Sequence, residues 1–387
     1  MTYLGKANAS DPGELIPMLD EVFFSESENP RMRFNTILPK LYKPEYSPCE
    51  NNIIVREDGA IKAAVGLYFD KMFVGSKMLT VGGIGNVAVT KDSRGKGYMV
   101  DCMNFAIEEM KALNTDFSVL GGDRQRYGYF GYEPVGFNYK FSINKTNIKH
   151  VFNIENKKNF RAVEVKSDDT EILAAIGKLY RSRPCRYERP DSKLYDILLS
   201  WDSVPFAIYE GERFVGYFVT DFDKKNVREI DTVSLDDTLD TVVCIMNALG
   251  VDSVGFSTPP YMLEKAEYLA RICCDSAIYN TEMLNIFNFG RFIDAFLSLK
   301  SASGTVLGDG KFTLLVHGIK RDENITITVN GGKVSVEQTD NAPDLELEHN
   351  EAVRMLCALF SQRRTGLPAF AQSWFPLPFF GHTIDGV

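Results

Sequence analysis

The stretch VAVTKDSRGKGYM, residues 87–99, decides the fold that this sequence predicts. Its first three residues, Val87, Ala88 and Val89, are apolar and partly β-branched, which favours a strand, and turn-forming residues end that strand. From Met99 onward, apolar side chains recur at the spacing of one helix face, at Met103, Ala106, Ile107, Met110 and Leu113. The pattern therefore predicts a strand, a tight turn and an amphipathic helix that packs on a sheet.

The turn between this strand and helix has the composition of an anion-binding site. Gly95 and Gly97 have no Cβ, so backbone amides can approach an anion closely, and the following helix directs its positive N-terminus toward it. Arg94 and Lys96 add positive charge. Glycine-rich basic turns also occur as plain solvent-exposed corners, so the turn alone leaves both interpretations open.

A tyrosine-rich segment follows the helix. Residues 117–120 predict a short parallel strand, which Gly121 and Gly122 end, and the chain continues through Asp123 into RQRYGYFGY, residues 124–132. A phenol with a pKa of about 10 stays protonated at neutral pH and can donate to a departing thiolate with a pKa of roughly 8 to 9. Tyr127 is therefore a candidate acid, with a core aromatic as the alternative, which we expect for Tyr129 and Tyr132.

Strand, turn, helix, strand and tyrosine-rich segment together resemble the GNAT superfamily of N-acetyltransferases, and YGYFGY (residues 127–132) resembles its enhanced-intracellular-survival-like branch. The resemblance implies that Val87, Ala88 and Val89 pair with the pantetheine arm of acetyl-CoA and that Tyr127 protonates the thiolate. It assigns the pyrophosphate to Arg94, Gly95, Lys96, Gly97, Tyr98 and Met99, although Met99 departs from the family's small residue, and it places Gly122 and Asp123 with the cofactor-binding residues.

The chain of 387 residues is long enough for two or three domains, and we expect an α/β (α+β) fold. The first domain, residues 1–147, is predicted to be the active acetyltransferase unit, with a last strand at 137–143 and a polar loop at 25–50 that walls a substrate cleft. The second domain, residues 148–285, repeats strand, turn and helix. We interpret it as a degenerate copy, because Asp236 and Asp237 would repel a pyrophosphate there and are expected to cap a helix.

The third domain, residues 286–387, is predicted to begin with a helix, continue with four strands and end with a helix capped by Asn350. This order resembles a sterol-carrier-like domain. It supplies the rival hypothesis, a non-catalytic protein that binds a lipid or a partner and senses CoA through its first domain. The apolar residues 374–381 are expected to pack against the protein. The resemblance implies that the C-terminus enters the first domain, with the α-carboxylate of Val387 as the base and Asp385 as its alternative.

Composition limits the remaining possibilities. A net charge of -9 and a pI of about 5.2 disfavour nucleic-acid binding and suit an amine substrate, small or lysine-type, whose identity stays open among aminoglycosides, polyamines, peptide lysines and cell-wall amines. We expect no membrane span, no secretory signal and no metal site, because the four histidines lie far apart. Seven cysteines without paired spacing indicate a cytoplasmic protein, and the family resemblance implies a homo-oligomer.

Overall fold

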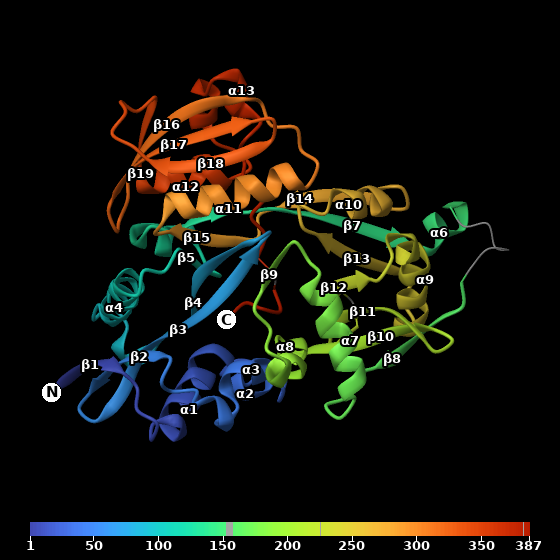
Figure 1. Ribbon diagram of the computed structural model, residues 1–387. Helices are drawn as coiled ribbons and strands as arrows, with labels where there is room; N and C mark the ends of the chain where they lie inside the picture. Colours follow the sequence, from blue (N-terminus) through green and yellow to red (C-terminus); the bar gives the residue numbers. More distant parts are fainter. Residues whose placement is uncertain (152–157, 225, 382) are drawn as a thin grey trace.

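The computed structural model describes residues 1–151, 158–224, 226–381 and 383–387, and places one large mixed sheet in the lower left and centre of Figure 1. Its strand order is β1-β2-β3-β4-β5-β15-β6, with β9 paired to β3. These strands are β1 (Thr2–Lys6), β2 (Asn52–Glu57), β3 (Ala60–Val74), β4 (Lys77–Val89), β5 (Phe117–Leu120), β15 (Glu282–Ile286), β6 (Glu133–Val135) and β9 (Cys185–Tyr187).

Helices cover both faces of this sheet. The amphipathic helix α4 (Tyr98–Ala112) packs on one face, through Cys102, Met103, Ala106, Ile107 and Met110, as its sequence predicted. The other face carries α1 (Pro12–Phe24), α2 (Phe34–Ile37) and α3 (Pro39–Tyr42). The polar loop expected at residues 25–50 thus contains two short helices, because Phe34 and Tyr42 are apolar enough to be buried in the core.

The second region has two smaller sheets, ordered β12-β11-β10-β8 and β13-β7-β14, which an isolated parallel bridge between Asn226 and Gly255 links. Their strands are β8 (Phe160–Glu164), β10 (Ser203–Glu210), β11 (Arg213–Asp221), β12 (Val227–Thr232), β13 (Ser253–Thr258), β7 (Asn138–Asn144) and β14 (Asp275–Tyr279). The helices are α6 (Lys145–Val151), α7 (Thr170–Arg181), α8 (Leu194–Leu199), α9 (Thr238–Leu249) and α10 (Leu263–Ala270). The arrangement repeats the strand, turn and helix order of the first sheet, in agreement with two tandem α/β units.

The two units exchange strands. The strand expected at 137–143 to close the first sheet is β7, and it lies between β13 and β14 of the second region. In return β15, from the end of the second segment, lies between β5 and β6 of the first sheet. Both strands bury alternate or successive apolar residues, so either sheet satisfies their sequence pattern. The division at residue 147 therefore separates chain segments that share their sheets.

The third region packs its sheet against α11 (Phe289–Ala302), which lies between that sheet and the first one (Figure 1). Strand order is β18-β17-β16-β19. Its elements are β16 (Gly310–His317), β17 (Asp322–Asn330), β18 (Lys333–Gln338), β19 (Leu345–Glu348), α12 (His349–Cys357) and α13 (Ala369–Gln372). As predicted, the apolar segment near the C-terminus packs inside, with Trp374, Leu377 and Phe379 fully buried.

Of the predicted helix caps, Asn350 is wrong and Asp237 is right in position only. The N-cap of α12 is Glu348, which forms a capping box with Glu351, so Asn350 lies inside the first turn instead. Asp237 occupies the N-cap position of α9 as predicted, but its side chain accepts from Lys158 Nζ at 2.5 Å and makes no capping hydrogen bond, whereas the side chain of Ser234 accepts from the Asp236 amide. Short polar side chains two or three residues apart compete for the same cap, and their sequence alone does not rank them.

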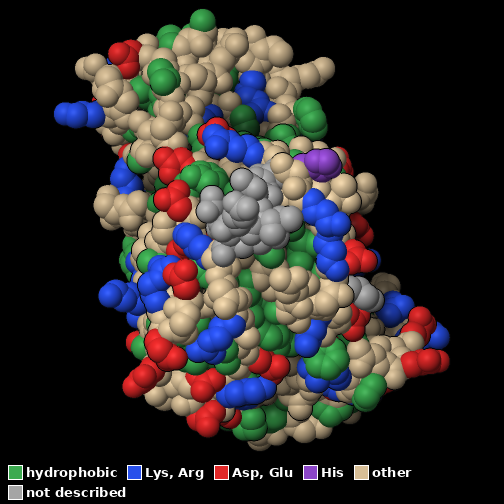
Figure 2. Space-filling view, turned by 90° about the vertical axis from the view of Figure 1, so that its right-hand side faces the viewer, with side chains coloured by type: hydrophobic (Ala, Val, Ile, Leu, Met, Phe, Trp, Pro, Cys, Tyr) green, Lys and Arg blue, Asp and Glu red, His purple; other side chains and the backbone are tan. Residues whose placement is uncertain are grey.

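Charges of both signs are interspersed over the face that the second region presents in Figure 2. None of the helices in the described parts of the chain has the length and apolarity that crossing a membrane requires.

Candidate active site

The turn before α4 has the backbone that an anion site requires. Gly95 and Gly97 have φ of +85° and +86°, in the left-handed region that favours glycine, and a methyl group at either would meet open space. The backbone conformation, and not a lack of space, therefore favours glycine at positions 95 and 97. Residues 94–97 are exposed, and the first-turn amides of α4 have no intrahelical acceptors.

Glu57 binds the side chains of Lys96 and Tyr98 in this turn. Its carboxylate accepts from Lys96 Nζ and from the Tyr98 hydroxyl, each at 2.7 Å, and these hydrogen bonds lower the pKa of Glu57. Met99 packs against the core under α4, which explains how a large residue replaces the small one of the family pattern. The predicted residues Arg94 to Met99 thus form one continuous turn and helix start.

Strand β4 separates from β5 just below this turn. The parallel pairing of the two strands covers only Val81–Ile84 against Phe117–Leu120, whereas β4 continues to Val89 against β3. Val87, Ala88 and Val89, the residues predicted to pair with pantetheine, therefore lie on a strand whose edge toward β5 is open. An open edge offers backbone amides and carbonyls to an extended amide-containing chain.

A bulge marks the point where the strands part. The register between β3 and β4 shifts there, and Asn86 has a φ of +39°. Asn86 accepts from the Tyr42 hydroxyl at 2.8 Å and donates to Asn52 Oδ1 at 2.7 Å. Gly66 is required opposite, because a methyl group on it would lie 2.1 Å from Asn86 Oδ1. Sequence reasoning missed Asn86, although a single amide inside an apolar strand was a visible signal.

Tyr127 ends the one-turn helix α5 (Arg124–Tyr127), which follows Gly122 and Asp123. Its ring lies over Gly122, where a methyl group would come within 2.3 Å of Cε2, and it clusters with Ile84 and Leu120. Burial is the largest cause that raises the pKa of Tyr127 above its usual value. The phenol is therefore protonated at neutral pH, as a proton donor must be.

The other two tyrosines of the segment differ from each other. Tyr132 is a fully buried core residue, as expected, and its hydroxyl lies 2.6 Å from that of Ser118. Tyr129 was expected in the core as well, but 90% of it is exposed. The turn Gly128–Phe130 directs this side chain outward while Phe130 takes the inward position.

Val387 lies on the opposite face of β4. A methyl group on Gly83 would come within 2.7 Å of the Val387 side chain, and one on Gly85 within 2.9 Å of its carbonyl carbon. The alternate residues Gly82 and Ile84 face α4 instead, as alternation along a strand requires. Val387 and Tyr127 thus flank the end of the β4–β5 pairing from opposite faces.

The terminal segment, residues 383–387, is anchored by two regions of the chain. Lys40 Nζ donates to the Ile384 carbonyl at 2.6 Å, and Trp201 Nε1 donates to the Gly386 carbonyl at 3.1 Å. Asp385 accepts from Arg189 through both oxygens, at 2.7 and 2.8 Å. This bidentate pair is buried, so Asp385 is an anchor of the segment. Burial lowers the pKa of Lys40 to about 8.

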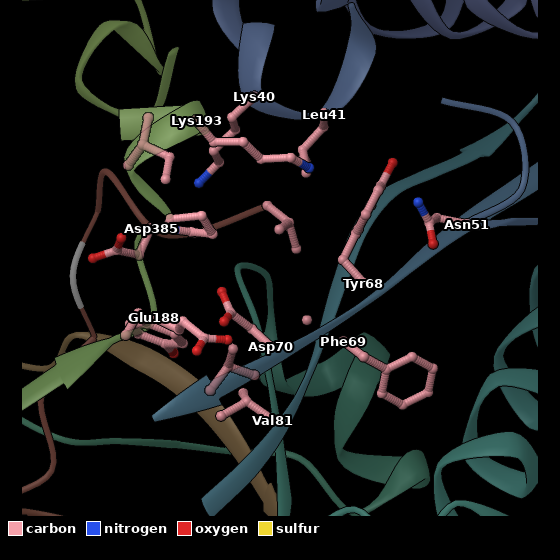
Figure 3. Close-up of a pocket in the computed structure, with 17 residues that line it drawn as sticks. Lys40, Leu41, Asn51, Tyr68, Phe69, Asp70, Val81, Glu188, Lys193 and Asp385 are labelled. Carbon is pink, nitrogen blue, oxygen red and sulfur yellow. The ribbon is translucent and has the colours of Figure 1, made fainter. Parts of the chain in front are cut away.

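Two cavities meet at Val387. One, of about 290 Å³, is surrounded by side chains that include Lys40, Asp70 and Asp385 (Figure 3), and burial raises the pKa of Asp70 to about 7. The other, of about 470 Å³, has mainly aromatic and acidic walls. These walls include Phe23, Phe24, Phe34, Trp201, Phe222, Asp202, Asp221 and Asp223, together with the cationic side chain of Arg228. Residues from the 25–50 stretch line both cavities, which agrees with its predicted place beside a cleft.

Within the described residues, no three side chains of the His, Cys, Asp or Glu type stand close enough to hold a metal ion, and His382 lies outside those residues.

An open strand edge beside a glycine turn at a helix N-terminus is the arrangement that the resemblance to the GNAT superfamily predicts. Residues 6–135 match the family described as an acetyltransferase (GNAT) domain. No curated protein matches the chain.

Solved structures extend the likeness to the whole chain. A GCN5-related N-acetyltransferase from Anabaena variabilis has 15% sequence identity and a TM-score of 0.68, over 98% of this chain and 97% of that one. A probable N-acyltransferase from Enterococcus faecalis has 14% identity and a TM-score of 0.67, over 92% and 90%. Eis1 from Mycobacterium abscessus has 12% identity and a TM-score of 0.57, over 91% and 88%. At these identities the likeness shows the fold.

Proposed function

We propose that this protein is an acetyl-CoA-dependent N-acetyltransferase that transfers the acetyl group to a primary amine within a ternary complex. The observation that carries the proposal is the opening between β4 and β5, which lies between the glycine turn and the two groups Tyr127 and Val387. The thioester substrate would place its pyrophosphate on residues 94–99 and its pantetheine arm along residues 87–89, with Gly122 and Asp123 beside it.

The transfer needs one acid and one base. The amine nitrogen bonds to the thioester carbonyl carbon, the C–S bond breaks, and the sulfur takes a proton from the Tyr127 hydroxyl. The proton lost by the amine passes, through water, to the Val387 carboxylate. A carboxylate with an ordinary pKa of about 3.5 is a weak base for an ammonium, but it orients the ammonium by charge. We choose Val387 over Asp385 because both oxygens of Asp385 are bound by Arg189.

The acceptor would enter through the cavity with aromatic and acidic walls, because it reaches Val387 from outside the first sheet. Carboxylates favour a cation, and aromatic faces favour its apolar or cationic parts. Both features suit a small-molecule or lysine-type amine. We propose that only residues 1–147 bind acetyl-CoA, since the second unit has Asp236 and Asp237 where the glycine turn would be.

The rival hypothesis of a lipid-binding third region gains no support from its interior. Apolar side chains of its sheet, of α11 and of the C-terminal segment share one core, in which Leu314, Ile327, Leu297 and Trp374 are fully buried. We propose instead that this sterol-carrier-like region has a structural part in the active site. We also propose that the protein is cytoplasmic, which its free cysteines support. We propose that it forms a homo-oligomer, which exposed apolar residues such as Phe360 support.

The test is release of free thiol from acetyl-CoA in the presence of a panel of amines that differ in size and charge. We expect turnover with at least one amine and none without an acceptor. Acetyl-CoA binding by calorimetry without turnover for any amine would favour the binding protein over the enzyme.

A further inference from the structure

The backbone that follows Tyr127 is held by a side chain of the third region. Asn350, in the first turn of α12, donates through Nδ2 to the Gly128 carbonyl and to Glu133 Oε1, each at 3.0 Å. Glu133 is fully buried and also accepts from Arg124 at 2.6 and 2.7 Å. Helix α5, which carries Tyr127, is thus bound at both ends: Glu133 binds the Arg124 side chain at its start, and Asn350 binds the Gly128 carbonyl at its end.

A second set of hydrogen bonds fixes the same segment from His349. The Ile319 amide donates to His349 Nδ1 at 3.3 Å, so the ring proton is on Nε2, which donates to Asn285 Oδ1 at 2.9 Å. Asn285 Nδ2 then donates to the Phe130 carbonyl at 2.9 Å. Burial lowers the pKa of His349 to about 4, so the ring stays neutral at physiological pH.

Gly131 is packed closely against the side chains of Asn285 and His349. Gly131 has a φ of +90°, and a methyl group on it would come within 3.0 Å of both Asn285 Nδ2 and His349 Nε2. Because Glu348 and Glu351 already cap α12, the amide of Asn350 is not needed at the helix end. Its hydrogen bonds therefore serve the tyrosine segment.

We propose that His349 and Asn350 are positioning residues for Tyr127, through which the third region holds residues 128–131 and so fixes the phenol at the end of the β4–β5 pairing. This proposal rests on the proposed function. A helix of only four residues would otherwise let the phenol move, and a displacement of about 1 Å can lower a catalytic rate by roughly 100-fold.

The experiment compares Asn350→Ala with the wild-type protein. We expect kcat to fall roughly 10- to 100-fold while KM for acetyl-CoA stays nearly unchanged. Tm should fall moderately, because the buried Glu133 loses one donor and keeps Arg124. In a Tyr127→Phe background the same substitution should cost no further activity, because the group that it positions is gone. A general structural defect would lower kcat equally in both backgrounds, and that outcome overturns the proposal. Asn341→Ala, an exposed asparagine of the same region, is the matched control.

His349 provides an independent variant. His349→Gln retains an N–H donor for Asn285 and should keep more activity than His349→Ala. Hydrogen exchange supplies a readout that needs no activity: the Gly131 and Tyr132 amides, which donate to the Gly128 and Tyr127 carbonyls, should exchange faster in Asn350→Ala. Unchanged exchange and unchanged kcat overturn the positioning role alone. Faster exchange with no turnover in the wild-type protein overturns the proposed function and this role with it.

Discussion

The role of Tyr127 can be tested by removing its hydroxyl group alone. We expect Tyr127→Phe to lower kcat by roughly 10²- to 10⁴-fold with acetyl-CoA affinity nearly intact, because the hydroxyl acts only as charge develops on sulfur. Since burial raises the pKa of Tyr127 above its usual value, loss of its proton should not lower kcat at neutral pH. Steady-state kinetics check this. Tyr129→Phe, at the 90% exposed position, is the control, and a change of less than about threefold in Tyr127→Phe would make that ring structural.

Val387 and Asp385 should respond differently to substitution. A C-terminal tag displaces and neutralises the Val387 carboxylate, so we expect turnover to fall sharply while Tm is unchanged. Asp385→Asn removes one of the two buried carboxylates that pair with Arg189, while Glu229 remains, and should destabilise the protein by about 1.5–3 kcal/mol, measured by chemical unfolding. A fully active tagged protein would move the search for the base to the first sheet.

Single residues show where sequence reasoning stops. Gly95 and Gly97 were identifiable because a left-handed turn has few alternatives to glycine. Lys40 and Arg189 were not, since a buried cation is recognised only by the distant groups that it contacts, here Ile384 and Asp385. Local sequence carries no information about such partners.

Among the structural elements, the turn before α4 provides the sharpest test of cosubstrate binding. We expect one acetyl-CoA per chain by calorimetry, and no measurable binding to Gly97→Glu, which places a carboxylate where an anion would bind and strains a φ of +86°. Gly97→Ala separates strain from charge. Gly211→Glu, at another open glycine with positive φ, is the control in the second unit. Two bound molecules per chain would contradict the assignment of binding to residues 1–147.

The positions of the helices and strands were largely predictable from the sequence, whereas the pairing of the strands was not. The apolar spacing of α4 is a local property, and this helix formed as expected. The place of β7 is set by Phe141 and Ile143, which fit the core of the second region as well as they would fit the first. Pairing partners depend on the whole chain, so the exchange with β15 required the structure.

At the scale of the molecule, the meeting point of the three regions is rich in buried charge. Glu282 is packed against Gly381, its Oε2 has no hydrogen-bond partner among the described residues, and burial raises the pKa of Glu282 to about 8. Because the folded state binds more protons than the unfolded state between about pH 4.5 and 8, stability should fall as pH rises through that range.

Replacement of this carboxyl tests the assignment. Glu282→Gln should stabilise the protein by about 1–3 kcal/mol above pH 8 and by little below pH 4.5, as followed by urea unfolding at several pH values. Glu337→Gln, at an exposed position of β18, is a control that should not change the slope between pH 5 and 8. An unaltered slope in Glu282→Gln would show that this group does not titrate within the folded protein.

The exchange of strands also determines when the first sheet can be completed during synthesis of the chain. As the chain leaves the ribosome, β5 and β6 emerge long before β15, which alone pairs with both. While residues 136–281 are translated, the nascent first sheet therefore has two strand edges without a partner, and such edges are where newly made proteins associate wrongly. We expect chaperones to matter most during this interval, before residue 286 has been translated.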